Sequence, residues 1–368
     1  MTSRASALVI SSALLASASC AAHGPTEEPA PTASVSAAAP AGPPMPFPGR
    51  ARFAEAIRAN EGCVTCHADV AATWAGSQHQ RADLEPAYRK AFEIEPLPFC
   101  RACHAPEGDP SKDEPRDVAE LGVGCVTCHV TDEGGVLAVP KSDSASDARA
   151  PHRIQRVADF ASARACATCH EFRFPHGRGE GPGAFMQTTV TEHAASPVAE
   201  QACADCHMPR DTHGKRSHAF AASRSQDVLR SAVDVTAERT GPRNVRVTLA
   251  PRHKGHAFPT GDLFRRLAIT AEALGPDHMV LARTDKFLAR HWGFKATQAG
   301  RELVRDDRVF YEPVSFDLEL PEVASPVPIA FTVTYQRVAH PNGIDDSDAE
   351  IEGEIEIASQ VLAPLTPR

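Results

Sequence analysis

The spacing of hydrophobic and polar residues changes near residue 230, which divides the chain into two differently built parts. Before this point, apolar patches with helical spacing are separated by polar loops. They predict helices at 53–60, 68–77, 86–92, 160–165 and 187–195. Beyond it, apolar and polar residues alternate, which predicts strands at 244–249, 267–272, 315–320, 329–335 and 351–357. We therefore expect a mostly helical domain with little regular core, followed by an all-β, antiparallel, sandwich-like domain.

The first fifty residues are expected to lie outside the fold. Residues 5–18 form an apolar stretch after a short basic start, the right length for a secretory signal and too short to span a membrane. Residues 23–49 contain eight prolines among many Ala and Ser, which is typical of an extended tether. The expected segments are a signal peptide at 1–20, a tether at 21–50, a helical domain at 51–230 and a β-domain at 231–368.

Cys20, at the end of the apolar stretch, is outside the cysteine pattern of the rest of the chain. Ala18-Ser19-Cys20-Ala21 resembles the lipobox of bacterial lipoproteins, whose cysteine becomes the lipidated first residue, although Ser17 stands where those proteins usually carry Leu. The alternative is ordinary signal cleavage near Ala18, which leaves a soluble periplasmic protein. We expect an exported protein that is periplasmic or an outer-membrane or cell-surface lipoprotein, contacting the membrane through a lipid at Cys20 if this residue is lipidated.

Charge and aromatic content narrow the function further. The formal net charge of −9 over 368 residues argues against a nucleic-acid-binding protein, which normally carries a basic stripe. Aromatic residues make up only 6% of the chain, with two Trp and three Tyr, which is little for the core of a protein of this size. We therefore expect a cofactor to supply part of the core.

Ten of the eleven cysteines form five C-x-x-C pairs, and a histidine follows each pair directly. C-x-x-C-H is the attachment signature of c-type haem, in which two thiols bind the porphyrin and the next residue ligates the iron. The predicted attachment residues are Cys63, Cys66, Cys100, Cys103, Cys125, Cys128, Cys166, Cys169, Cys203 and Cys206. The predicted proximal ligands are His67, His104, His129, His170 and His207.

Zinc knuckles and disulfides are the alternative interpretations of these pairs. Zinc sites do not require a histidine directly after the second cysteine, and thioredoxin-like redox pairs occur singly. We therefore predict five covalently attached haem c groups, with the porphyrins serving as the core of residues 51–230.

Several short segments resemble the cytochrome c-552/c-554-type multihaem cytochromes, a superfamily that includes hydroxylamine oxidoreductase and pentahaem nitrite reductase. They are Cys63-Val-Thr-Cys66-His67, Trp74-Ala-Gly-Ser77-Gln-His79, Gly122-Val-Gly-Cys125, Ser217-His218-Ala-Phe220 and Gly255-His256-Ala-Phe-Pro-Thr-Gly261. The resemblance covers roughly residues 60–265 and implies a multihaem redox protein. The chain departs from pentahaem nitrite reductase, whose catalytic motif carries Lys in place of His, and it has fewer haem motifs than hydroxylamine oxidoreductase.

The sixth iron ligands are expected to be histidines, because the folded part contains only three methionines. The candidates are His79, His152, His176, His218 and His256. His79 is twelve residues beyond His67, about 18 Å along a helix, so it should ligate a different haem. His213 is the nearest rival of His218.

Some histidines remain outside this set. His193 occupies the place of Trp74 in a short internal echo, Trp74-Ala-Gly-Ser77 against His193-Ala-Ala-Ser196, so packing and ligation are equally open. His278, His291 and His340 belong to the β-domain and are expected at the surface.

We expect an electron-transfer relay in the bacterial cell envelope, since five haems in so short a segment must lie nearly in contact. Its partners would be redox proteins or quinol-linked electron donors. The alternative is an oxidoreductase acting on a small nitrogen or sulfur compound at a haem with an open distal site. A third possibility is a β-domain that docks a partner. The sequence leaves the oligomeric state open.

Overall fold

The computed structural model of the protein describes residues 50–113, 115–141, 147–173, 185–294 and 301–365. All of them belong to one compact unit, Pro43–Arg368. Cys20, residues 21–49 of the tether and His176 lie outside the described residues. Among the helices described, none has both the length and the apolar composition needed to cross a bilayer.

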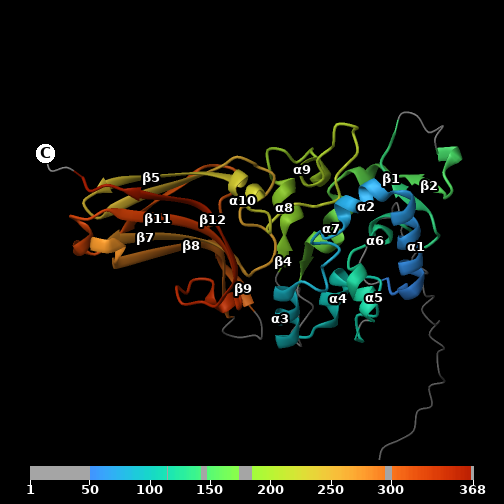
Figure 1. Cartoon of the computed structure of the whole chain (residues 1–368), viewed down its shortest axis with the longest axis horizontal. Coiled ribbons are helices and arrows are strands. Elements are labelled where there is room, and N and C mark those ends of the chain that lie inside the picture. Colours follow the sequence, from blue (N-terminus) through green and yellow to red (C-terminus); the bar gives the residue numbers. More distant parts are fainter. Residues whose placement is uncertain (1–49, 114, 142–146, 174–184, 295–300, 366–368) are drawn as a thin grey trace, which may run out of the picture. The chain divides into compact units, whose positions relative to one another are not determined.

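Short helices dominate the first part of the described chain (Figure 1). They are α1 (Phe53–Cys66), α2 (Ala68–Trp74), α3 (Pro86–Ile94), α4 (Pro98–His104), α5 (Arg116–Leu121), α6 (Cys125–His129), α7 (Arg164–His170), α8 (Thr189–Ala194), α9 (Cys203–His207) and α10 (Gln226–Ala232). Local capping explains some of their starts. The Glu85 carboxylate accepts a hydrogen bond from the backbone N–H of Tyr88 at the start of α3, and Ser225 caps α10 in the same way.

Short strand pairs and 3₁₀ turns interrupt the helices. Strands β1 (Val136–Ala138) and β2 (Ile154–Arg156) pair in parallel, and β3 (Glu171–Arg173) pairs antiparallel with β4 (Phe185–Thr188). The 3₁₀ turns are η1 (Asp147–Arg149) and η2 (Ala158–Ala161). The sequence did not predict these strands, because three or four residues are too few to show an alternating pattern.

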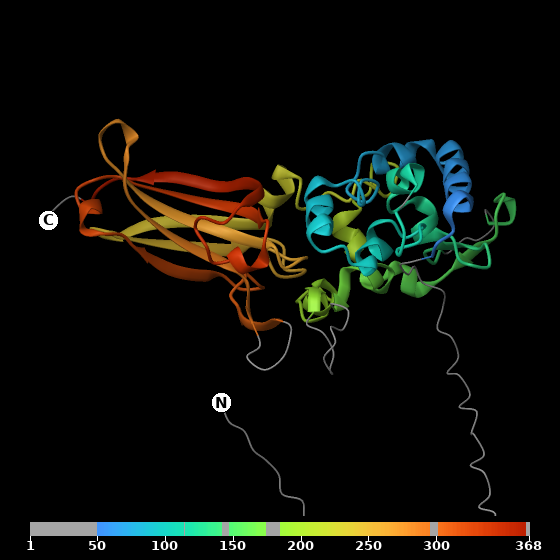
Figure 2. The ribbon, with the colours of Figure 1, turned by 90° about the horizontal axis from the view of Figure 1, so that it is seen from below.

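After α10 the described chain is built from antiparallel strands. They are β5 (Val233–Gly241), β6 (Asn244–Pro251), β7 (Arg265–Leu274), β8 (Val280–Phe294), β9 (Arg301–Asp306), β10 (Val314–Glu319), β11 (Ile329–Val338) and β12 (Ile351–Leu362), with 3₁₀ turns η3 (Pro276–His278), η4 (Glu322–Ala324) and η5 (Pro341–Gly343). One sheet has the strand order β10-β6-β5 and the other β12-β11-β7-β8-β9. Figure 2 shows the strands as two layers.

The main apolar core lies among these strands. It contains twenty buried residues, which include Val247 and Leu249 of β6, Ile269 of β7 and Val333 of β11. The main cluster among the helices contains only four, Ala56, Trp74, Leu121 and Val126. The helical part therefore holds much less apolar core than the strands, as expected of a segment packed around cofactors.

The coarse prediction of helices together with antiparallel sheets is confirmed. All five predicted strands fall on observed strands, whereas β5, β8 and β9 were not predicted. The helix predicted at 187–195 is observed as α8, which begins two residues later than predicted because Gln187 and Thr188 end β4. The change from helix to strand occurs between Ala232 and Val233, within one compact unit, so the domain boundary at 230–231 stays a prediction.

Candidate functional site

Each C-x-x-C-H motif lies at the end of a helix. α1 ends at Cys66, and α4, α6, α7 and α9 end at the motif histidine. Residues three and four apart share a helix face, so this turn can present both thiols and the imidazole on one side. We number the sites in chain order: residues 63–67 (site 1), 100–104 (site 2), 125–129 (site 3), 166–170 (site 4) and 203–207 (site 5).

The ten motif cysteines are free thiols in the described chain, so no disulfide ties up their sulfur atoms. The Cys103 and Cys169 side chains hydrogen-bond to each other, and so do those of Cys166 and Cys203. These two contacts make site 4 a direct neighbour of sites 2 and 5. Burial also raises the pKa of Cys100 to about 11, so this thiol is neutral at pH 7.

Four of the five motif histidines face a second histidine ring. The ring centroids are 6.5 Å apart for His67 and His152, 6.1 Å for His170 and His79, 6.3 Å for His129 and His218, and 6.0 Å for His207 and His256. Metal–imidazole bonds are about 2 Å long, which with the ring radii places two rings on one metal with centroids about 6 Å apart. The four pairs therefore fit a six-coordinate haem iron.

Hydrogen bonds orient several of these rings for iron binding. The Nδ1–H group donates to a backbone carbonyl in His104 (Ala82, 2.7 Å) and in His129 (Leu137, 2.9 Å). The predicted distal ligand His218 donates to its near neighbour Arg216 in the same way, at 3.0 Å. A bond at Nδ1 leaves Nε2 as the free ligand atom and fixes the direction in which it points.

Burial also keeps the two imidazoles of site 4 in the neutral form that binds iron. Desolvation by burial lowers the pKa of His79 to about 3, with a further contribution from His170. Burial lowers the pKa of His170 to about 4, followed by the effects of His207 and Arg265. Both rings are therefore uncharged at pH 7.

Site 2 differs from the other four. The described ring neighbour of His104 is Tyr88, which stacks flat on it with centroids 3.7 Å apart and an interplanar angle of 6°. An axial imidazole stands edge-on to the porphyrin, so a ring stacked on its face lies beside it on the same side of the haem. Tyr88 thus supports His104, and within the described residues no histidine ring faces His104 as in the other sites. The predicted ligand His176 lies outside the described residues.

The structure brings His79, His152, His218 and His256 together with sites 4, 1, 3 and 5, respectively. The rival candidate His213 is exposed. The assignment of the four histidines as distal ligands stays a prediction with this geometry behind it.

The remaining histidines fall into two groups. Both ring nitrogens of His193 bond to backbone carbonyls, and its ring is buried. His278 and His340 are exposed, whereas His291 is 4% exposed and hydrogen-bonds to Asp307 and Asp345. The surface expectation for His291 is wrong, because these acceptors, contributed by other segments, satisfy a polar ring away from water.

Sequence reasoning missed two residues near the sites, Tyr88 and Glu192. Tyr88 lies in an ordinary amphipathic helix, and nothing in its neighbourhood indicates stacking on His104, sixteen residues away. Glu192 precedes His193 and is buried against Arg308 at 2.8 Å. A glutamate on a short helix is usually solvated, so only the three-dimensional pairing identifies it.

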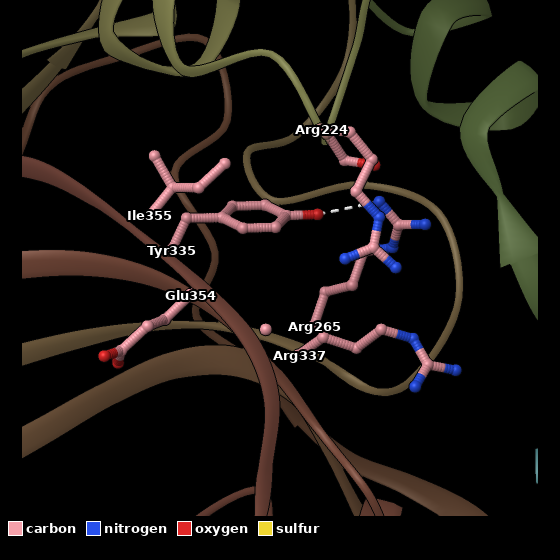
Figure 3. Close-up of a pocket in the computed structure, with 8 residues that line it drawn as sticks. Arg224, Arg265, Tyr335, Arg337, Glu354 and Ile355 are labelled. Atoms are coloured by element: carbon pink, nitrogen blue, oxygen red, sulfur yellow. Dashed lines mark hydrogen bonds between the residues drawn. The ribbon is translucent and has the colours of Figure 1, made fainter. Parts of the chain in front are cut away.

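A separate pocket of about 240 Å³ lies against β11 and β12. Figure 3 shows the guanidinium groups of Arg224, Arg265 and Arg337 on one side of the Tyr335 ring. Arg265 donates to the Tyr335 hydroxyl at 2.7 Å and pairs with Asp262 at 3.0 Å. Acidic side chains also pair with Arg224 (Glu85) and Arg337 (Glu352). No motif residue lines this pocket.

Comparison with known proteins agrees with the motif geometry. Residues 62–130, which contain sites 1, 2 and 3, match the family model "Cytochrome c554 and c-prime". A penta-heme cytochrome c552 from Thermochromatium tepidum has a similar structure, with a TM-score of 0.63 and 19% identity over 85% of this chain and 99% of that one. In its first three sites and in its fold, the chain is similar to multihaem c-type cytochromes.

Other comparisons add little to this assignment. MtrC from Shewanella baltica OS185 aligns with 56% of this chain and 34% of its own at 10% identity, with a TM-score of 0.19. No curated protein matches the chain. For a multihaem cytochrome of this family, covalently bound haem c is the cofactor, and the free thiols and facing imidazoles described above fit it.

Proposed function

We propose that this multihaem cytochrome carries five haem c groups and acts as an electron-transfer relay in the bacterial cell envelope. The five C-x-x-C-H motifs give the number of haems, because each supplies two thiols and one axial imidazole. The structural likeness to a five-haem protein over most of the chain is consistent with this number.

The facing histidine pairs carry the proposal. When bound, haem c supplies an iron that takes up or gives away one electron. At sites 1, 3, 4 and 5 the two imidazoles would take both axial positions, which leaves no position for a substrate. Sites closed in this way can pass electrons but cannot bind a small molecule at the metal.

Contacts between the motifs support electron transfer within two groups of sites. Sites 2 and 4 touch through Cys103 and Cys169, and sites 4 and 5 touch through Cys166 and Cys203. Sites 1 and 3 are linked by Asn60 of α1, whose side-chain oxygen accepts the Cys125 N–H at 2.8 Å. Neighbouring sites that touch through their attachment residues favour transfer from one haem to the next.

Export and membrane attachment are part of the proposal. The apolar stretch at residues 5–18 would direct export, and Cys20 would carry a lipid that holds the protein at the periplasmic or outer face of a membrane. The tether at 21–50 would separate the folded part from that surface. Redox proteins or quinol-linked donors would supply or accept the electrons.

Intact mass and a redox titration test the relay. The mass of the exported protein should exceed that of the processed polypeptide by five haem masses, and the haems should stay attached in acidified acetone. Histidine in place of methionine as the distal ligand predicts mostly low potentials. Several overlapping steps are expected because neighbouring irons interact electrostatically. Fewer than five haems, or a single step at positive potential, would contradict the relay.

A second candidate function is supported by site 2. Near His104, the buried Tyr88 hydroxyl and the Asp83 Oδ1 atom have no hydrogen-bond partner among the described residues. Unpartnered buried polar atoms are rare and need an explanation, such as a ligand or water. These atoms lie on the His104 side of the haem, so the open position would come from the lack of a facing histidine ring among the described residues. Site 2 could then act on a small nitrogen or sulfur compound at that position.

Carbon monoxide distinguishes the two functions. An open site 2 predicts that one haem of the reduced protein binds carbon monoxide and that the oxidised protein shows one high-spin haem. Five low-spin haems and no carbon monoxide binding would instead indicate a ligand from outside the described residues, with His176 the first to replace.

A further inference from the structure

Two neighbouring residues of α8 hold the peptide groups on either side of His256. His193 donates from Nδ1 to the carbonyl of Gly255 at 2.9 Å. The Glu192 carboxylate accepts the backbone N–H of Ala257 at 3.2 Å. The loop that carries His256 is therefore fixed immediately before and immediately after the residue that faces site 5.

The same histidine also holds the segment that leads into site 5. Its other nitrogen, Nε2, lies 2.8 Å from the carbonyl of Gln201, two residues before Cys203. Since a carbonyl only accepts hydrogen bonds, each of these contacts uses an N–H of the ring, and the two form together only when both ring nitrogens carry a proton, as in an imidazolium. One buried histidine ring thus joins the backbone next to His256 to the backbone that presents the site 5 motif.

Trp74 makes the corresponding contact at site 3, in the segment that the sequence echo pairs with His193. Its Nε1–H donates at 3.0 Å to the carbonyl of Val123, which is also two residues before the first motif cysteine. In both segments the serine three residues later donates its N–H to the ring residue's carbonyl, at 2.9 Å in Ser77 and 3.0 Å in Ser196. The two segments are therefore similar in structure as well as in sequence. Histidine makes a second hydrogen bond, through its other ring nitrogen, that tryptophan cannot make.

Glu192 anchors this arrangement to the strands. Its carboxylate accepts a hydrogen bond from the Thr260 hydroxyl at 2.7 Å and pairs with the buried Arg308 at 2.8 Å. The Tyr311 hydroxyl donates to the Glu192 backbone carbonyl. A buried ion pair with further hydrogen bonds costs several kcal/mol to break, so α8 and the His256 loop are expected to move together.

We propose that His193 is a positioning residue for site 5. It sets the distance between His207 and His256, whose rings lie 6.0 Å apart and nearly parallel, at 13°. The inference rests on the proposed function, in which His256 is the distal ligand of this haem. Ligand-orienting partners of this kind typically change metal affinity or activity 10- to 100-fold when removed, that is by about one to two orders of magnitude.

Four variants of the whole protein test this role: His256→Ala, His193→Phe, the double variant, and Trp74→Phe as the matched control. The readouts are the covalent haem count by mass, the number of low-spin haems by electron paramagnetic resonance, and the redox titration. His193→Phe should retain all five haems and shift or convert the one low-spin haem that His256→Ala removes. If that step shifts by a tenfold change in its equilibrium constant, the potential moves by about 59 mV.

The double variant should affect only the haem that His256→Ala alters. Trp74→Phe should instead perturb the haem of site 3. His193→Gln, which retains an N–H donor, should lie between the wild type and His193→Phe and also serves if the phenylalanine variant fails to mature. If His256→Ala converts one haem but neither His193 variant changes it, the positioning role is wrong and the relay stands. If His256→Ala leaves every haem low-spin, the ligand assignment in the proposed function is wrong.

Discussion

At the scale of single residues, the sequence predicts which histidines are candidate iron ligands but not how they pair. The motif histidines follow from their cysteines, and the scarcity of methionine points to histidine as the distal partner. Which histidine meets which motif is a long-range property that local patterns do not contain. His79 illustrates this: helix geometry excludes the nearest motif, but only the fold places its ring opposite His170.

Replacing His79 tests this pairing. His79→Ala removes the imidazole 6.1 Å from His170, and alanine offers no ligand atom, so one haem should change from low-spin to high-spin while all five stay attached. Electron paramagnetic resonance and intact mass measure the two quantities. His213→Ala is the control because His213 is exposed. An unchanged spectrum for His79→Ala would refute the pairing.

His291 offers a pH-dependent test away from the haem sites. Burial opposes its charge, but the hydrogen bonds that its ring donates to the Asp307 and Asp345 carboxylates outweigh burial and raise the pKa of His291. A raised folded-state pKa adds stability that is fully present below the unfolded value, about 6.5, and is lost as the pH rises through the folded value. His291→Gln should therefore lower the free energy of unfolding by about 1–3 kcal/mol near pH 6, and by less near pH 9.

Denaturant unfolding followed by circular dichroism measures this difference. His340→Gln provides the matched control, because His340 is exposed and a surface substitution changes stability by about 0.5 kcal/mol or less. A stability loss for His291→Gln that is equal at both pH values would show that the ring acts by packing rather than by charge.

At the scale of helices and strands, the sequence predicts best where one periodicity dominates. The five predicted strands alternate clearly because each has one face in the sandwich core. β8 was missed because its alternation is irregular. Its register shifts opposite Ala273/Leu274 of β7, where Leu281 of β8 is the extra residue, and its pairing with β9 shifts between His291 and Trp292. α8 was predicted within the helix at 187–195, but the contacts of Glu192 and His193 at its end come from distant segments that no local pattern reveals.

The sandwich core predicts how β6 responds to truncation. Leu249 is fully buried between the two sheets, so Leu249→Ala should lower the free energy of unfolding by about 2–5 kcal/mol through lost burial and a cavity. Val304→Ala on β9 is the control, since Val304 is 68% exposed. Denaturant unfolding compares the two variants, and equal stabilities would contradict the position of this core.

At the scale of the whole molecule, the sequence predicts a helical part packed around cofactors and a strand part with an apolar core. The buried apolar residues are distributed in that way. The main helical cluster has four buried apolar residues and the strand cluster has twenty. The contacts that join helices to strands, such as those of Glu192 with Ala257 and Arg308, could not be predicted, because each links residues far apart in the chain.

Lipidation of Cys20 is a prediction about the whole protein in its cell. Cys20→Ala should release the protein from the membrane fraction without changing its haem content, because Cys20 belongs to none of the five C-x-x-C-H motifs. Cell fractionation with haem staining measures the distribution. A wild-type protein that already fractionates as soluble would show that Cys20 carries no anchor.

The spin states of the oxidised protein test the central claim most directly. Electron paramagnetic resonance, normalised to the number of covalent haems from intact mass, should show five haems with at least four low-spin, one for each facing histidine pair. The fifth, at site 2, decides between a closed relay and an open site. Two or more high-spin haems in the intact protein would contradict the relay built on four histidine pairs.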